Sequence, residues 1–151
     1  MPLYFAYGSN MGSAQMHQRC PDSRCLGRAE LAGYAWLIAR QGYASIRAQS
    51  DSRVEGVLWE ISANDEAALD RFEEVALDVY RKHYLSVSHE GISRTALVYV
   101  DPITELGTAP AEYVIRMNAA LADAQLSADY LARQIRPFIA PAQPDAAETA
   151  G

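Results

Sequence analysis

The chain has 151 residues and a formal net charge of −6, with 50% of its residues hydrophobic and 21% charged. This composition is ordinary for a soluble domain, and a chain of this length can bury enough surface to fold without a metal ion or a disulfide. The acidic balance and the lack of clustered Lys and Arg argue against nucleic-acid binding, and no apolar run approaches the length of a membrane span.

The sequence predicts one domain over residues 1–140 and a flexible tail over residues 141–151, which are rich in Ala and Pro. The first residues, Met1-Pro2-Leu3-Tyr4, lack the basic and apolar regions of a signal peptide. We therefore expect a cytoplasmic protein.

The first half of the chain is dominated by strand patterns. Residues 3–7 are short, apolar and aromatic, which predicts a buried strand. Ser13 could cap a short helix that ends before Pro21. Further strands are predicted over residues 25–31, 34–40, 43–49 and 54–61. Gly33 and Gly42 lie between these strands, and the spacing predicts antiparallel neighbours in a meander.

The second half combines helix and strand patterns. The predicted elements are a helix over residues 64–75, strands over residues 80–89 and 93–100, and helices over residues 110–124 and 128–136. Ser62 or Asn64 could cap the first helix, Glu90-Gly91 is typical of a hairpin turn, and Pro110 is typical of a helix start. The sequence therefore predicts an α+β fold, a mostly antiparallel and barrel-like sheet flanked by helices.

The cysteines and histidines do not indicate a metal or redox site. Cys20 and Cys25 are separated by four residues, unlike the two-residue spacing of redox and zinc motifs, and we expect two free thiols. His17, His83 and His89 lack a metal-binding spacing. No metal and no other cofactor is predicted.

The segment Tyr7-Gly8-Ser9-Asn10, at the end of the first predicted strand, is a candidate ligand-binding loop. Glycine lets a ligand approach the backbone closely, and successive N–H groups can point at one carboxylate or carbonyl oxygen. A helix beginning just beyond would add its positive end to that field. The alternative is an ordinary turn, because Gly, Ser and Asn are common turn residues.

The longer stretch Tyr4-Phe5-Ala6-Tyr7-Gly8-Ser9-Asn10-Met11 resembles the signature of the gamma-glutamylcyclotransferase-like family. The resemblance extends over the chain up to Pro141, and it includes Gly33-Tyr34, Val54-Glu55-Gly56-Val57-Leu58-Trp59, Leu69-Asp70-Arg71-Phe72-Glu73, Tyr80 and Tyr113. It implies the barrel-like fold of that family and a single glutamate as general acid and base.

The predicted helix offers four acidic residues for the role of general acid and base: Glu66, Asp70, Glu73 and Glu74. At about 100° per residue, Glu73 falls roughly 100° from the centre of the apolar face, where it could reach a pocket. Glu74 falls roughly 160° away and would face water. This geometry and the family's spacing both favour Glu73. Glu74 departs from the family, because many relatives have glycine after the catalytic glutamate.

The resemblance implies an intramolecular acyl transfer. The α-amine of a γ-glutamyl group attacks its own γ-carbonyl, which forms 5-oxoproline and releases an amine or an amino acid. Glu73 would move the proton, and the backbone amides of Gly8, Ser9 and Asn10 would hold the substrate's oxygens. The substrate-binding residues implied are Tyr7, Gly8, Ser9, Asn10, Tyr80 and Tyr113.

Two alternatives remain open at the level of sequence. The same chemistry could act on a different γ-glutamyl substrate, such as a biosynthetic intermediate, or the fold could serve as a non-catalytic binding or stress-response module. The sequence does not identify the leaving group or decide whether glutathione is a substrate. A homodimer is expected only by analogy with the family.

Overall fold

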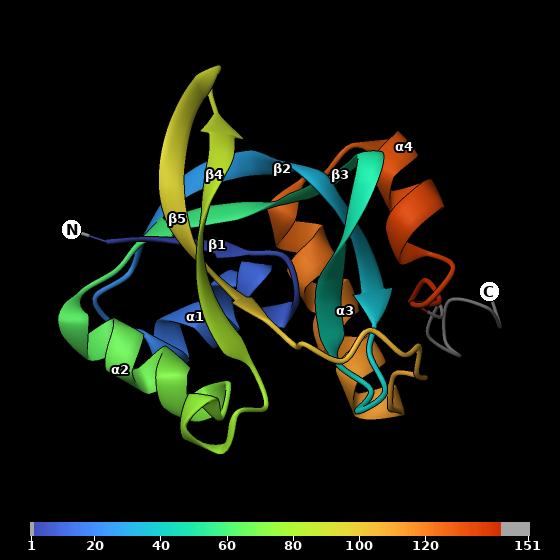
Figure 1. Ribbon diagram of the computed structural model, residues 1–151, viewed down its shortest axis with the longest axis horizontal. Helices are drawn as coiled ribbons and strands as arrows, with labels where there is room; N and C mark the ends of the chain where they lie inside the picture. The colour runs from blue at the N-terminus through green and yellow to red at the C-terminus, as the bar shows by residue number, and fades with distance from the viewer. Residues whose placement is uncertain (1, 143–151) are drawn as a thin grey trace, which may run out of the picture.

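The computed structural model describes residues 2–142, in which five strands form a closed barrel in the order β1-β3-β2-β4-β5 (Figure 1). Strand β1 (Leu3–Ala6) pairs antiparallel with β3 (Ala44–Glu60) and parallel with β5 (Ile92–Val100). All other strand pairs are antiparallel. The prediction of a mostly antiparallel, barrel-like α+β fold is therefore confirmed.

One long hairpin of β2 (Arg24–Ile38) and β3 replaces the predicted meander of four short strands, so that prediction is wrong. Gly33, with φ of 83°, lies at a shift of register between Ala32 and Tyr34 and does not end the strand. At this irregularity four residues of β3, residues 49–52, lie opposite the single residue Gly33, and pairing resumes on both sides. Gly42 does lie in the turn between the two strands, with φ of 95°.

The second hairpin joins β4 (Arg81–His89) to β5 through Glu90 and Gly91. Both residues have positive φ, 52° and 76°, as the two-residue turns that suit the twist of a hairpin require. The predicted turn is confirmed here, because its signal is contained in two adjacent residues.

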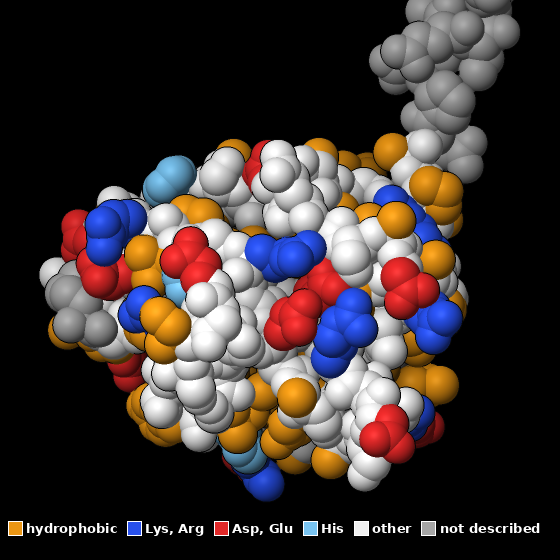
Figure 2. Space-filling view, turned by 90° about the horizontal axis from the view of Figure 1, so that it is seen from above, with side chains coloured by type: hydrophobic (Ala, Val, Ile, Leu, Met, Phe, Trp, Pro, Cys, Tyr) orange, Lys and Arg blue, Asp and Glu red, His pale blue; other side chains and the backbone are white. Residues whose placement is uncertain are grey.

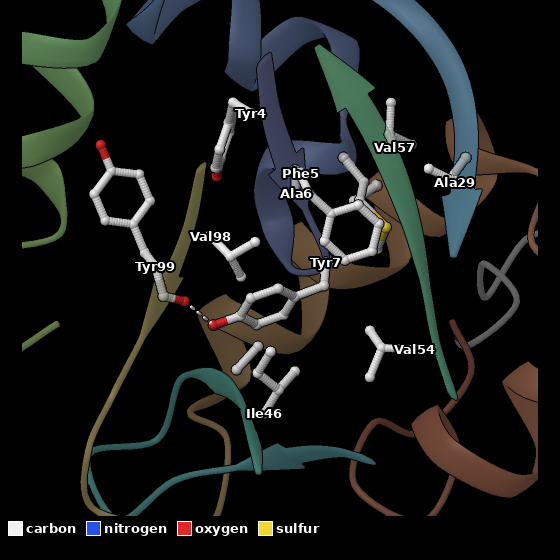
Figure 3. Packing of buried hydrophobic residues seen from close by; sticks show 14 of the residues in the cluster. Tyr4, Phe5, Ala6, Tyr7, Ala29, Ile46, Val54, Val57, Val98 and Tyr99 are labelled. Atoms are coloured by element: carbon white, nitrogen blue, oxygen red, sulfur yellow. Dashed lines mark hydrogen bonds between the residues drawn. The ribbon is translucent and has the colours of Figure 1, made fainter. Parts of the chain in front are cut away.

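Apolar side chains fill the barrel. Phe5 is fully buried and points toward Val57 and Ala29 in Figure 3. A Cβ atom at Gly56 would lie 2.3 Å from the Ala6 carbonyl oxygen. Strands β1 and β3 can therefore approach this closely only because residue 56 has no side chain.

Helices surround the barrel. They are η1 (Ser9–Met11), α1 (Ser13–Arg19), α2 (Ala63–Phe72), η2 (Val75–Leu77), α3 (Ala111–Ala124), α4 (Ala128–Tyr130) and η3 (Leu131–Ile135). Gly12 caps α1, and the predicted cap Ser13 instead donates its N–H and hydroxyl to Asp123 of α3, which ties the two helices together. The segment from α4 through η3 closely matches the helix predicted over residues 128–136.

Helix α2 begins as predicted but ends earlier. Ser62 and Asp65 form a reciprocal capping box, so Ser62 and not Asn64 is the cap. The helix ends at Phe72 and not at residue 75, because Glu74 adopts a left-handed conformation with φ of 52°. Glu73 is therefore the C-cap residue of the helix.

On the face seen in Figure 2, acidic and basic side chains are interspersed. Ion pairs of this kind include Arg53 with Glu30 and with Glu55. Among residues 2–142, no helix is both long and apolar enough to cross a membrane. Most of the predicted tail, residues 143–151, lies outside the described residues.

Candidate active site

A cavity of about 300 Å³ lies between the end of β1, the C-terminal end of α2 and helix α3. Its walls include every residue that the sequence suggested for a site: Tyr7, Gly8, Ser9, Asn10, Glu73, Tyr80 and Tyr113. Segments that lie far apart in the chain therefore meet around one space.

The loop after β1, which lines this cavity, contains backbone N–H groups that lack an acceptor within residues 2–142. The first hydrogen bond of η1 runs from the Met11 amide to the Gly8 carbonyl oxygen at 3.0 Å, so the amides before it have no partner within the helix. Within residues 2–142, the Gly8 and Asn10 amides donate to no protein acceptor, whereas the Ser9 amide is directed at the Tyr113 hydroxyl. The amides of Gly8 and Asn10 are thus available to a ligand.

The missing side chain of Gly8 gives room for this geometry. A Cβ atom there would lie 3.0 Å from the Tyr113 hydroxyl oxygen and 3.2 Å from the Ala44 Cβ. The absence of a side chain lets α3 and β3 close around the loop. This is a close approach of the kind for which glycine is used.

The side chains of Ser9 and Asn10 support the loop from behind. Gln15 of α1 donates to the Ser9 hydroxyl at 2.7 Å and to the Asn10 Oδ1 at 2.8 Å. The side-chain Nδ2 of Asn10 donates to the Tyr4 hydroxyl at 3.1 Å, and Arg19 donates to the Asn10 Oδ1 at 3.1 Å. Asn10 is buried with its donor and acceptor atoms both used, so only its backbone faces a ligand.

The three predicted tyrosines make different use of their hydroxyls. Tyr7 donates to the carbonyl oxygen of Tyr99, as Figure 3 shows, and Tyr80 donates to the carbonyl oxygen of Ala44 at 2.8 Å. Tyr113 instead accepts from the Ala44 amide at 3.4 Å, which leaves its hydroxyl hydrogen for another acceptor. Burial raises the pKa of Tyr113 to about 12, although hydrogen bonds from the backbones of Ala44 and Ser9 lower it. Tyr113 is the tyrosine suited to donate to a ligand.

Glu73 reaches the cavity from the end of α2, so the helical-wheel argument does not apply to it. As the C-cap residue, with φ of −88° and ψ of 3°, it leaves the helix path and turns toward the barrel. Within residues 2–142, its carboxylate forms no hydrogen bond and no ion pair closer than 4.0 Å. Glu74 follows in a left-handed conformation, which glycine adopts more easily than glutamate.

The environment of Glu73 favours its neutral form. Burial raises the pKa of its carboxyl to about 7, while the charges of Arg19 and Arg116 lower it and that of Glu74 raises it. The side chain is half-buried and lines the cavity. The negative end of the α2 dipole acts in the same direction as burial. At neutral pH this carboxyl is present in both protonation states, which suits proton transfer.

Several residues of the cavity wall were not predicted from the sequence, chiefly Tyr4, Arg19, Tyr99 and Arg116. Tyr4 lies within the stretch that carries the family resemblance, so its position was available as a signal. The other three have no motif around them, because only the folded chain brings α1, β5 and α3 to one cavity.

A polar cluster beside the cavity holds α2 against the barrel. The Tyr99 hydroxyl of β5 donates to Asp70 at 2.7 Å. Lys82 of β4 forms ion pairs with Asp70 at 3.1 Å and with Glu66 at 2.5 Å. These contacts join one face of α2 to two strands and thereby fix where Glu73 emerges.

Cys20 is buried and Cys25 is exposed, and both are free thiols. In the part of the chain that the structure describes, no group of His, Cys, Asp or Glu side chains could hold a metal ion.

The cavity lies beside the barrel, between a loop with free backbone amides and one half-buried glutamate. This is the arrangement of a small-molecule site. The chain belongs to the gamma-glutamyl cyclotransferase, AIG2-like family, whose sequence profile matches residues 4–114. No curated protein matches the chain significantly.

Solved structures agree on the fold. A gamma-glutamyl cyclotransferase is 23% identical, with a TM-score of 0.82 over 95% of this chain and 90% of its own. An uncharacterized protein from Homo sapiens is also 23% identical, with a TM-score of 0.81 over 95% of this chain and 90% of its own. YkqA from Bacillus subtilis is 25% identical, with a TM-score of 0.79 over 95% of this chain and 56% of its own.

Proposed function

We propose that this protein cyclises γ-glutamyl compounds, releasing 5-oxoproline and an amine or amino acid, with Glu73 as the single general acid and base. One observation carries the proposal. Glu73 lines the same cavity as Gly8 and Asn10, whose backbone amides have no acceptor within residues 2–142, and its surroundings raise its pKa to about 7.

Such a glutamate meets the two requirements of the reaction. At neutral pH the α-amine of the substrate is an ammonium ion, which cannot attack a carbonyl carbon until it loses a proton. The Glu73 carboxylate takes that proton, the amine nitrogen bonds to the γ-carbon, and the proton then passes to the departing nitrogen as its bond to that carbon breaks. The attacking nitrogen sheds a second proton as the lactam forms, and this proton leaves with the departing amine as its ammonium ion. No covalent intermediate with the protein and no co-reactant is needed.

The loop after β1 supplies the second part of the mechanism. Negative charge develops on the γ-carbonyl oxygen as the amine attacks, and fixed N–H donors stabilise such charge without reorganising. The amides of Gly8 and Asn10 and the hydroxyl of Tyr113 are three donors that this site offers for that purpose. Tyr7 and Tyr80 shape the walls and hold the backbone, since their hydroxyl hydrogens are bonded within the protein. The cavity holds the substrate folded on itself, which brings the reacting atoms together.

The test is to incubate the purified protein with a panel of γ-glutamyl amino acids and γ-glutamyl amines and to measure 5-oxoproline. We expect release from at least one substrate and a loss of about 100-fold or more in Glu73→Gln, as removal of a positioned acid–base group produces. Tyr34→Phe, a change outside the cavity wall, is the control. A folded wild-type protein that releases no 5-oxoproline from any panel member would instead favour the non-catalytic binding module.

A further inference from the structure

Two arginines line the cavity, and they differ in whether their charge is already compensated. Arg116 forms an ion pair with Glu112 at 2.7 Å and also donates to Gln15 at 3.2 Å. Arg19 has no carboxylate within 4.0 Å in residues 2–142, and the one hydrogen bond of its side chain is to the neutral Asn10 Oδ1. Arg19 is therefore a cation with unused donors at the edge of the cavity.

The Arg19 guanidinium is held in place. Its Cζ atom lies 4.3 Å from the centre of the Phe72 ring, a stacking contact between a cation and an aromatic face. The hydrogen bond to Asn10 fixes a second point of the group. A planar guanidinium held in this way is well suited to a carboxylate, because its remaining N–H donors match the two carboxylate oxygens.

Arg19 lies beside Phe72, at the more exposed side of the cavity. Tyr7, Tyr80 and Tyr113, which enclose the inner part, are each less than 10% exposed, whereas Phe72 beside Arg19 is 53% exposed. A γ-glutamyl group that reacts between Glu73 and the loop amides occupies the inner part. The departing half must leave through the outer part, past Arg19.

We propose that Arg19 binds a carboxylate on the leaving group, so that the protein acts on γ-glutamyl amino acids in preference to γ-glutamyl amines. The inference rests on the proposed cyclotransferase function and adds to it the chemical class of the substrate. An amino-acid leaving group carries its carboxylate on the carbon next to the departing nitrogen, and an amine leaving group lacks one.

The experiment compares two substrates that differ only in that carboxylate, γ-glutamyl-alanine and γ-glutamyl-ethylamine. The measured quantity is the ratio of their kcat/KM values in wild type, Arg19→Gln, Arg19→Lys and the control Arg24→Gln, which changes an exposed arginine outside the cavity. The ratio is used because Arg19 also lowers the pKa of Glu73, and this effect is common to both substrates.

We expect the wild-type ratio to favour γ-glutamyl-alanine and to fall by about 10- to 100-fold in Arg19→Gln, as loss of a charge-assisted pair predicts. Arg19→Lys should fall less, and Arg24→Gln should match wild type. An unchanged ratio in Arg19→Gln would overturn the inference, whether activity on the two substrates is kept or is lost equally on both. If wild type forms 5-oxoproline from neither substrate, the proposed function itself fails, and this inference with it.

Discussion

Replacing Glu74 with glycine should stabilise the protein, because Glu74 holds a backbone conformation that glycine adopts more easily. Glu74 follows the C-cap of α2 with φ of 52° and ψ of 45°. Its amide donates to the Arg71 carbonyl oxygen at 3.1 Å, which continues the hydrogen bonding at the end of the helix. In this conformation the Cβ atom crowds the following carbonyl oxygen, which costs an L-residue about 1–2 kcal/mol.

The net effect of Glu74→Gly is smaller than this strain. Glycine has more freedom in the unfolded chain, which offsets about 0.5–1 kcal/mol of the gain. The backbone change should therefore stabilise by about 0.5–1 kcal/mol. Removing a negative charge at the C-terminal end of α2 adds about 0.3 kcal/mol. For a chain of this length, a change of about 1 kcal/mol corresponds to a rise in Tm of about 2–4 °C.

Urea and thermal unfolding of wild type, Glu74→Gly and Glu74→Gln separate the two contributions. Glutamine removes the charge but keeps the Cβ atom, so the difference between the two variants isolates the backbone strain. We expect Glu74→Gly to be the more stable variant by about 0.5 kcal/mol or more. If Glu74→Gln equals or exceeds it in stability, the reasoning from the left-handed conformation is refuted.

Three further predictions concern the barrel, the loop and Glu73. Gly56→Ala should cost roughly 3 kcal/mol or more in urea unfolding, because its Cβ would lie 2.3 Å from the Ala6 carbonyl oxygen; stability close to wild type would contradict the packing of β1 on β3. Gly8→Ala should lower kcat/KM by about 10- to 100-fold with a smaller loss of stability, because its Cβ would press on the Tyr113 hydroxyl and shift the loop; wild-type kinetics would show that the loop position is unimportant. The raised pKa of Glu73 means that the folded protein holds a proton that the unfolded chain releases near pH 4.5. The unfolding free energy of wild type, relative to Glu73→Gln, should thus fall between about pH 4.5 and 7 and level off above, and a flat difference would contradict the burial of this carboxyl.

Local signals accounted for the parts of the fold that they determine. The Glu90-Gly91 turn was predicted, and Ser62 was one of the two caps predicted for α2, because each signal depends on a few adjacent residues. The length of β2 and β3 was not, because a glycine such as Gly33 looks like a break until the partner strand shows that pairing resumes beyond it. The earlier end of α2 depends on the conformation of Glu74, which its residue type does not favour.

The candidate site also combines residues that the sequence suggested with residues that it did not. The amide loop and Glu73 stand within motifs, so the order of residues in the chain is enough to suggest them. The unpaired charge of Arg19 could not be predicted, because it depends on which carboxylates lie near it in the folded chain. The same holds for the hydroxyls of Tyr7 and Tyr80, whose hydrogens are used by the distant carbonyl groups of Tyr99 and Ala44.

The pH dependence of kcat/KM for 5-oxoproline formation, measured for wild type and for Glu73→Gln, tests the central claim most directly. With Glu73 as the base, the wild-type value should rise with pH and approach a plateau above about pH 7, where the carboxyl becomes ionised. The Glu73→Gln variant should be about 100-fold or more less active and should lack this ionisation. A Glu73→Gln variant that keeps wild-type activity and the same pH profile would contradict the account.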